Sequence, residues 1–396
     1  MSNEPLLPKP ARGAHVPELD GVRGIAILMV MALHFVCSAI TVPQSRLEYV
    51  LGRLTGYGAW GVDLFFVLSG FLITGILWDT RGRAEYFKTF YMRRTLRIFP
   101  LYYATLLVLV VLLPAGLLER YAPEALKIRE LQWWLWPYLA NVYVAKQGGF
   151  DIPYVSHFWT LAVEEHFYLV WPFVVGLLSR VTVVRVSMVS IAFALIMRAG
   201  FEHWYPGSLY GHVLTPFRLD ALCIGALLAL SVRGPRGIDG MAHVAKRGWL
   251  PAAFGVLACS VLNAKLPGVL PVQALRETLL ALLFGFGIVL ASHGAGPPLL
   301  KQTLRSPWLR FFGKYSYGLY VFHGIIAYAL GVHGSLPLFE RLTGGHLSGL
   351  LLQALLASLA SIGLSVLSYE LFEERFLRLK ERFEPKAGKA AKPAAV

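Results

Sequence analysis

The sequence has little charge and almost no cysteine. Charged residues make up 15% of its 396 residues, whereas soluble domains carry roughly 25%. A chain with so little charge cannot cover a water-facing surface in the usual way, and its composition also excludes a disordered chain, a collagen, a coiled coil and a secreted disulfide scaffold. Cys37, Cys223 and Cys259 are isolated within apolar stretches, without a CxxC pair or metal-ligand spacing. We therefore expect them to pack as small hydrophobic side chains.

Hydrophobic residues are abundant instead. They make up 56% of the chain, aromatic residues make up 13%, and the mean hydropathy is +0.57. A membrane-spanning helix needs about 20 mostly apolar residues, and only helices let such runs satisfy their backbone in lipid. The sequence therefore predicts an all-α, polytopic membrane bundle of about ten transmembrane helices. The expected spans lie near residues 22–42, 59–78, 100–118, 157–178, 181–199, 213–232, 249–264, 273–292, 314–333 and 349–372.

The first predicted span is expected to remain in the protein as a signal anchor. It is too long for the core of a signal peptide, and no small-residue cleavage site follows it directly. We expect three parts in the chain: a flexible N-terminal tail at 1–17, a membrane domain at 18–376 and a basic, flexible C-terminal tail at 377–396.

The net charge of +14 comes mainly from Lys and Arg in short loops between the apolar runs. This pattern is typical of membrane topology and of contact with anionic lipid or substrate phosphate, and we expect no nucleic-acid partner. With a cytoplasmic N-terminus, roughly 25 basic residues face the cytoplasm and roughly 10 face the opposite side. An even number of spans then returns the C-terminus to the cytoplasm, so both termini are expected there.

The longest expected loop on the outer side, about 119–156, is rich in aromatic residues, among them Trp133, Trp134, Trp136 and Tyr138. Such a density is typical of an interfacial aromatic belt. A platform on which a sugar ring stacks is the functional alternative.

Charged residues within the predicted spans are functional candidates, because a charge near the bilayer centre costs about 2.5–3.5 kcal/mol on insertion scales. Arg23 and His34 are 11 residues apart in the first span, which places them within about 20° of one helix face and about 16 Å apart along the axis. That face would carry a cation at the cytoplasmic mouth and an imidazole deep in the membrane. The alternative is that Arg23 only anchors the helix end and His34 hydrogen-bonds a neighbouring carbonyl.

Three arginines, Arg93, Arg94 and Arg97, precede the third predicted span on its cytoplasmic side. Arg94 and Arg97 are three residues apart and share a helix face. Guanidinium groups grip phosphates in a bidentate manner, so this pair suits a pyrophosphate or a ribose phosphate. The alternative is a stop-transfer cluster that contacts anionic lipid.

Two adjacent acids, Glu164 and Glu165, lie within the fourth predicted span. Adjacent positions on a helix point about 100° apart, so both acids cannot face the same partner. One is expected to pair with an arginine or to orient a histidine, and the other to face a neighbouring helix. A metal site formed by His157, Glu164 and His166 is not supported, because no HExxH or comparable spacing is present.

Further polar candidates lie near the sixth and ninth predicted spans. Arg218 and Asp220 stand near the start of the sixth, where structural pairing and substrate contact are equally good interpretations. Ser316, Tyr320 and His323 lie on one side of the ninth.

Several of these segments occur in the order found in the acyltransferase-3 family, which the chain resembles over roughly residues 18–376. LDGVRG at 19–24 followed by His34 resembles the Arg-x10-His motif that opens the family. GVDLFFVLSGF at 61–71 resembles its second helix, RRTLRIFPLYY at 93–103 its third, and WTLAVEEHFYL at 159–169 its WSLsVEEQFYL signature. These matches add Asp63, Ser69, Tyr102 and Trp159 to the candidate site residues.

The sequence departs from the family pattern at three positions. Thr160 stands where Ser is usual, His166 where Gln is usual, and Phe376 where Pro is frequent. Some members carry a C-terminal hydrolase-like domain that completes transfer to a glycan, whereas this chain ends soon after the last predicted span. We expect either that the membrane domain completes the transfer alone or that a separate extracytoplasmic partner does so; a homodimer is a further option.

The resemblance implies a metal-independent O-acyltransferase in a bacterial cytoplasmic (inner) membrane. Its donor would be cytoplasmic acyl-CoA, most simply acetyl-CoA, with the nucleotide phosphates on Arg94, Arg97 and Arg93 and with Arg23 at the entry. The acceptor would be a hydroxyl of a glycan or glycoconjugate on the outer side. Since a thioester is already reactive, the acceptor needs a general base, and histidine suits that role.

His34 is therefore expected to deprotonate the acceptor hydroxyl, with Glu164 or Glu165 orienting the site or balancing its charge. Transient acylation of His34 is the second possibility. A transporter or flippase of an anionic solute is the rival function, although the two halves show no matched Gly or Pro breaks. A sensory or scaffolding protein with structural ion pairs is another.

Overall fold

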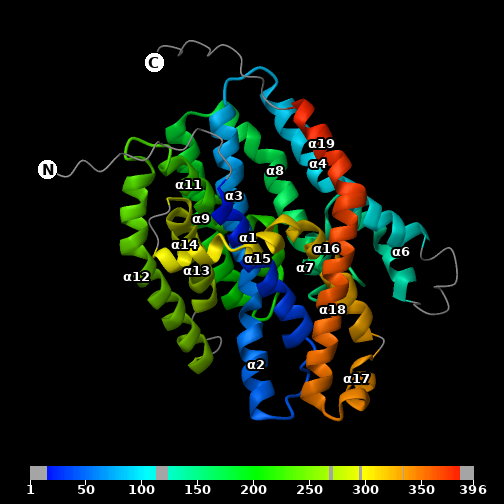
Figure 1. The fold of residues 1–396 in the computed structure, drawn as a ribbon. Helices are drawn as coiled ribbons and strands as arrows, with labels where there is room; N and C mark the ends of the chain where they lie inside the picture. Colours follow the sequence, from blue (N-terminus) through cyan, green and yellow to red (C-terminus); the bar gives the residue numbers. More distant parts are fainter. Residues whose placement is uncertain (1–15, 113–123, 267–270, 294–296, 333, 384–396) are drawn as a thin grey trace.

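The computed structural model describes residues 16–112, 124–266, 271–293, 297–332 and 334–383, and these residues form helices and short connections without a strand (Figure 1). The long helices are α1 (Pro17–Ala32), α3 (Trp60–Thr80), α4 (Tyr86–Leu107), α8 (Trp159–Leu177), α9 (Arg180–Trp204), α11 (Thr215–Ser231), α12 (Gly237–Lys265), α13 (Val272–His293), α16 (Ser316–Val332) and α18 (His346–Ser368). The shorter ones are α2 (Arg46–Gly56), α6 (Glu124–Leu135), α7 (Ala140–Gln147), α10 (Tyr210–Val213), α14 (Pro298–Leu304), α15 (Pro307–Lys314), α17 (Leu336–Thr343) and α19 (Glu374–Leu379).

Three helices contain or continue into a π-helical turn. These turns are η1 (Leu33–Cys37) after α1, η3 (Val108–Leu112) after α4 and η5 (Tyr369–Glu373) between α18 and α19. Short 3₁₀ turns are η2 (Tyr57–Ala59), η4 (Ser156–Phe158) and η6 (Lys380–Phe383). A π turn rotates the following residues relative to an ideal α-helix and occurs frequently at functional sites. The first one contains His34.

Seven helical segments of the described chain are long and apolar enough to cross a membrane, or eight if the bent pair α16 and α17 forms one span. The multi-pass, all-α prediction is therefore confirmed. The helices α8 and α12 coincide with two further expected runs, but they do not reach the same apolar content. The count of ten spans and the cytoplasmic termini stay predictions.

The helical chain continues beyond the expected end of the membrane domain. Helix α19 ends at Leu379 and η6 ends at Phe383, so residues 377–383 extend the last helix. The rest of the expected C-terminal tail, and most of the N-terminal one, lie outside the described residues. Within the expected outer loop, α6 and α7 form two short helices.

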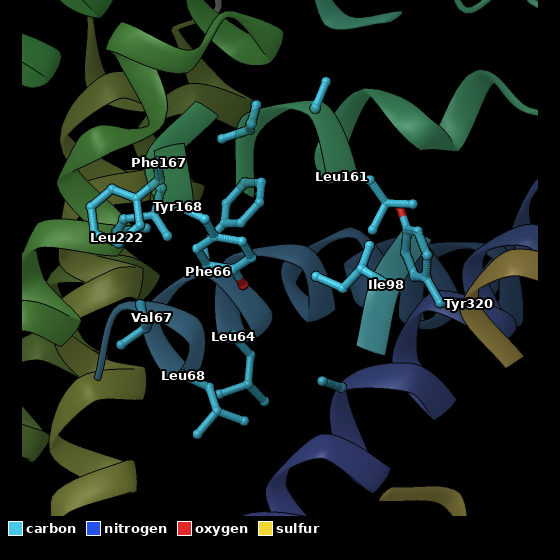
Figure 2. Close-up of a cluster of buried hydrophobic side chains, with 14 of the residues drawn as sticks. Leu64, Phe66, Val67, Leu68, Ile98, Leu161, Phe167, Tyr168, Leu222 and Tyr320 are labelled. Carbon is cyan, nitrogen blue, oxygen red and sulfur yellow. The ribbon is translucent and has the colours of Figure 1, made fainter. Parts of the chain in front are cut away.

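Helix α3 runs through the middle of the bundle. In Figure 1, α9, α11, α12 and α13 lie on one side of it, and α4, α6, α16 and α18 lie on the other. Figure 2 shows side chains of α3 such as Phe66 and Leu68 in a core that also receives Leu222 from α11 and Phe167 from α8. The helices that carry the candidate residues are therefore held against one central element.

Glycine allows α3 and α11 to approach closely. A Cβ on Gly70 would overlap the backbone carbonyl of Leu222, and a Cβ on Gly225 would overlap that of Val67. Lipid tails are as apolar as the side chains, so the burial of apolar surface does not drive helices together in a membrane. Small residues promote helix association there because they let two backbones come into contact. This pair of glycines thus fixes the distance between two helices that carry candidate site residues.

A buried ionic network joins α3, α9, α11 and α13. Arg198 Nη2 lies 2.5 Å from Asp220 Oδ2, and Arg218 Nη1 lies 2.6 Å from Glu277 Oε2. Arg218 also pairs with Asp63. All five side chains are buried. The two guanidiniums and three carboxylates come from four helices and pair with one another, so the network fixes how these helices are rotated toward one another.

The aromatic residues of the expected outer loop pack against α4. Trp136 stacks on Tyr103 with the ring centres 5.8 Å apart, and Tyr138 stacks on Tyr102 at 4.1 Å. Trp133 is exposed instead. These contacts use the aromatic rings to hold α6 and the following turn onto the bundle.

Candidate active site

Two cavities lie within the helical bundle. The smaller, which we call the arginine cavity, lies between α1, α3, α4, α8 and α16. The larger, which we call the histidine cavity, is bounded by η1, α3, α8, α11, α16 and α18.

Three guanidinium groups line the arginine cavity, those of Arg23 on α1 and of Arg94 and Arg97 on α4. The guanidinium carbon of Arg94 lies 5.2 Å from the centre of the Tyr168 ring, which supports the cation on an aromatic face. Arg23 Nη1 lies 3.0 Å from Asp20. Three cations on two helices therefore converge on one space, an arrangement suited to a ligand with several negative charges.

Glu164 faces the arginine cavity, whereas Glu165 lies outside the lining of both cavities. Near Glu164 in that lining, the hydroxyl groups of Ser69 and Tyr168 are hydrogen-bonded to each other. Glu165 Oε1 is buried without a hydrogen-bond partner among the described residues. The 100° separation of adjacent helical positions thus sends one carboxyl to the cavity and the other into the protein interior.

His34 lines the histidine cavity, and a row of imidazole rings lies behind it. The ring of His34 is 4.9 Å from that of His323, which is 5.0 Å from that of His157. His34 Nδ1 lies 2.9 Å from the carbonyl oxygen of Val30. Because a carbonyl can only accept, Nδ1 carries the hydrogen and Nε2 of the neutral ring remains an acceptor. A histidine that acts as a general base through Nε2 must be in this tautomer, because Nε2 needs a free lone pair to take a proton.

Helices α3 and α11 contribute charged groups to the wall of the histidine cavity. Asp63 and Arg218 line it as an ion pair, and His212 lines it beside them. The His212 ring lies 5.4 Å from the Trp159 ring, and its Nδ1 lies 3.7 Å from Glu277 Oε1. The cavity therefore combines an indole face with charged groups that can hydrogen-bond hydroxyls.

The two cavities adjoin at three residues that line both of them, Val62 on α3, Thr160 on α8 and Tyr320 on α16. We call this shared wall the seam. Figure 2 shows Tyr320 beside Leu161, which also lines the arginine cavity, with Ile98 of α4 nearby. The arginines and His34 thus lie on opposite sides of the seam.

Most predicted site residues reach one of these cavities. The arginine cavity receives Arg23, Arg94, Arg97, Ser69, Glu164, Ser316 and Tyr320. The histidine cavity receives His34, Asp63, His157, Trp159, Arg218 and again Tyr320. His323 lies one ring behind His34.

Four other predicted residues lie outside both linings: Arg93, Tyr102, Glu165 and Asp220. The Tyr102 hydroxyl donates to the backbone carbonyl of Leu135 at 2.6 Å, so it ties α4 to α6. Asp220 belongs to the buried ionic network. Among the described residues, no group of three or more His, Cys, Asp or Glu side chains is arranged to hold a metal ion.

Sequence reasoning missed Arg198, Glu277 and His212. Arg198 and Glu277 lie inside the predicted spans 181–199 and 273–292, so the cost of a charge in the membrane was the signal that could have found them. His212 had no such signal, because it stands just before a predicted span and is recognised only through the cavity that it lines.

The fold and the site define a multi-pass membrane protein with a cationic cavity beside a histidine-lined one. The sequence model of the acyltransferase-3 family, described as an acyltransferase domain, matches residues 16–370. The chain therefore belongs to this family of acyltransferases, and the resemblance noted in its motifs is confirmed.

Individual relatives are similar at 27–29% identity. The peptidoglycan O-acetyltransferase OatA of Listeria monocytogenes is 28% identical over 329 residues, which are 78% of this chain and 49% of OatA. The putative peptidoglycan O-acetyltransferase YrhL of Bacillus subtilis is 29% identical over 332 residues, 78% of this chain and 48% of YrhL. The acyltransferase MdmB of Streptomyces mycarofaciens is 27% identical over 393 residues, 91% of this chain and 88% of MdmB.

The match thus spans about half the length of the first two relatives and most of the third. No solved structure matches the chain significantly.

Proposed function

We propose that the protein is a membrane O-acyltransferase that moves an acyl group, most simply acetyl, from acyl-CoA to a hydroxyl of a glycan or glycosylated acceptor. The observation that carries this proposal is the pair of adjoining cavities, one lined by three guanidiniums and the other by His34. Two relatives, the peptidoglycan O-acetyltransferase OatA and the putative peptidoglycan O-acetyltransferase YrhL, support the reaction and the acceptor class.

The donor binds with its phosphates in the arginine cavity. Arg94 and Arg97 supply bidentate donors from one helix face, and Arg23 approaches from α1. The pantetheine arm then extends along the cavity toward the seam, which brings the thioester carbonyl close to the histidine cavity. In the predicted topology the arginine end opens to the cytoplasm, where acyl-CoA is made.

The acceptor binds in the histidine cavity, and His34 activates it. With Nδ1–H held by the Val30 carbonyl, Nε2 can take the proton of an acceptor hydroxyl as the oxygen attacks the thioester carbon. In the second possible route Nε2 attacks first, and the acyl group waits on His34 until the acceptor arrives. Glu164, on the arginine side, balances the positive charge of the donor site.

Incubation of the purified protein with labelled acetyl-CoA and a cell-envelope glycan extract as acceptor tests the proposal. Wild-type protein is expected to release CoA thiol, and H34A should lose at least about 99% of this activity, in line with removal of a general base. H243A is the matched control, because His243 is an exposed ring on α12. Wild-type turnover by a folded H34A protein would exclude both roles of His34.

The same preparation separates the two routes and the rival function. A brief reaction without acceptor, quenched in denaturant, leaves label on the protein only if an acyl-enzyme forms. A transporter would bind or move an anionic solute without cleaving the thioester. Comparison of cell-envelope glycans by mass spectrometry, with and without the gene, identifies the acceptor.

A further inference from the structure

The seam between the two cavities carries two hydroxyl groups. Of the three side chains that line both cavities, Val62 is apolar, so Thr160 and Tyr320 supply the polar side-chain atoms of this wall in the described part of the chain. Both residues are buried. An acyl group that moves across this shared wall, from a donor in the arginine cavity to an acceptor in the histidine cavity, comes next to these hydroxyls.

The two hydroxyls share one backbone acceptor. The Tyr320 hydroxyl donates to the carbonyl oxygen of His157 at 2.6 Å. Thr160 Oγ1 lies 3.3 Å from the same oxygen and is hydrogen-bonded to the Tyr320 hydroxyl. Three groups from η4, α8 and α16 therefore form one compact hydrogen-bonded unit.

Counting hydrogens shows that this unit has one donor to spare. Each hydroxyl carries one hydrogen, and the His157 carbonyl, which the backbone N–H of Trp159 also reaches, needs at most one of the two. The second hydrogen lies between Thr160 and Tyr320. A carbonyl oxygen placed at the seam can accept it without leaving any buried group of the unit unpaired, since either hydroxyl can keep the bond to His157.

We propose that the Thr160–Tyr320 pair is an oxyanion-binding element that donates this hydrogen bond to the acyl carbonyl oxygen during transfer. The inference rests on the proposed function. Preorganised donors aimed at a developing negative charge contribute strongly to catalysis, because no reorganisation is needed as the charge appears. The ring of Tyr320 is held for this purpose by Phe65, His157 and His323, with ring centres 6.4, 5.3 and 5.4 Å away.

The step balances as follows. His34 Nε2 takes the proton of the acceptor hydroxyl while the oxygen forms a bond to the thioester carbon, and the π electrons of the carbonyl move to its oxygen. The pair at the seam hydrogen-bonds that oxyanion. The electrons then re-form the carbonyl, the C–S bond breaks with its electron pair on sulfur, and His34 returns the proton to the thiolate.

The test compares Y320F, T160V and the double variant with T160S, which keeps the hydroxyl. Each single variant leaves one hydroxyl, which the His157 carbonyl retains, so no hydrogen remains for the substrate. Both single variants should therefore lower kcat for acyl transfer by roughly 10²–10³-fold, the usual effect of losing one oxyanion donor. The double variant should be no slower than about the slower single one, because the spare donor is already gone.

The KM for acetyl-CoA and the binding of free CoA should stay near the wild-type values in all variants, which also shows that each is folded. T160S should keep activity within about threefold of wild type. If wild type turns over acetyl-CoA but Y320F and T160V keep its kcat, or if their effects multiply in the double variant, the oxyanion role is wrong and the proposed function stands. If wild-type protein cleaves no thioester, both the oxyanion role and the proposed function are wrong.

Discussion

At the scale of single residues, the chemistry depends on which atoms face which cavity. Arg23, Arg94 and Arg97 line one cavity and the imidazole of His34 lines the other, so the roles of these arginines and of His34 can be tested independently. Nε2 of His34 is left as the free acceptor because Nδ1–H donates to the backbone carbonyl of Val30. This local hydrogen bond, four residues away along the chain, therefore sets the tautomer of the ring.

Removal of a cation from the arginine cavity should weaken donor binding. We expect R94A to raise the KM for acetyl-CoA roughly tenfold or more and to change kcat less, because hydrogen bonds to charged groups contribute about 1.5–3 kcal/mol. K88A is the control for a lost positive charge on the same helix, since Lys88 pairs with Glu85 on the exposed side of α4. Steady-state kinetics measure both constants, and an unchanged KM in R94A would remove the phosphate-binding role.

The two adjacent acids should behave differently on substitution. E164Q removes the carboxylate that faces the arginine cavity and should lower the rate of thioester cleavage roughly tenfold or more. E165Q replaces a carboxyl whose buried Oε1 has no hydrogen-bond partner among the described residues. This substitution should change the midpoint of thermal unfolding more than the rate of thioester cleavage. Equal rates for E164Q and wild type would contradict the assignment of Glu164 to the site.

At the scale of elements, the first span carries Arg23 on its α-helix and His34 in the π turn that follows. Eleven residues of regular α-helix would return His34 to the face of Arg23. In the structure His34 belongs to η1, and the two side chains line neighbouring cavities that meet at the seam. The imidazole lies on the acceptor side of the seam and the cation on the donor side, as their separation of about 16 Å along the helix axis allows.

The contact between α3 and α11 should tolerate no side chain at its glycines. We expect G70A and G225A each to destabilise the protein by about 1–3 kcal/mol or more, because a Cβ at either position overlaps the backbone of the other helix. G287A on α13 is the control, since a Cβ there meets no atom within 4 Å. Thermal unfolding in detergent measures the effect, and wild-type stability of G70A and G225A would mean that the helices are not in backbone contact.

At the scale of the whole molecule, the buried ionic network connects the wall of the histidine cavity to the outer helices. We expect D220A to destabilise the protein by about 3–5 kcal/mol, since it leaves the buried guanidinium of Arg198 without its shortest ion pair. E374A, which breaks the exposed pair with Arg378 on α19, should change stability by less than about 1 kcal/mol. Unfolding midpoints of the two variants should therefore differ clearly; equal midpoints would show that the network is not a support for the fold.

The predicted topology can be measured at two exposed positions. Figure 1 shows α17 and the end of α19 at opposite ends of the bundle. In a protein with its three cysteines replaced by serine, T343C on α17 should react with a membrane-impermeant thiol reagent added to intact cells. E381C in η6 should react only after the membrane is dissolved, as expected for a cytoplasmic C-terminus. The reverse labelling pattern would invert the orientation of the chain.

Sequence alone determined the helical class, the family and the charged residues that line the cavities, because long apolar runs require helices in lipid and charges within them are costly enough to stand out. Tertiary structure decided which of Glu164 and Glu165 faces the site, that Tyr102 and Asp220 tie helices together, and that Thr160 meets Tyr320 160 residues away. The physical reason is that periodicity gives the relative directions of side chains on one helix. The rotation of each helix about its axis decides which neighbour a side chain contacts. That rotation depends on the glycine contacts and ion pairs that join distant parts of the chain, and on local departures from the α-helix such as the π turn.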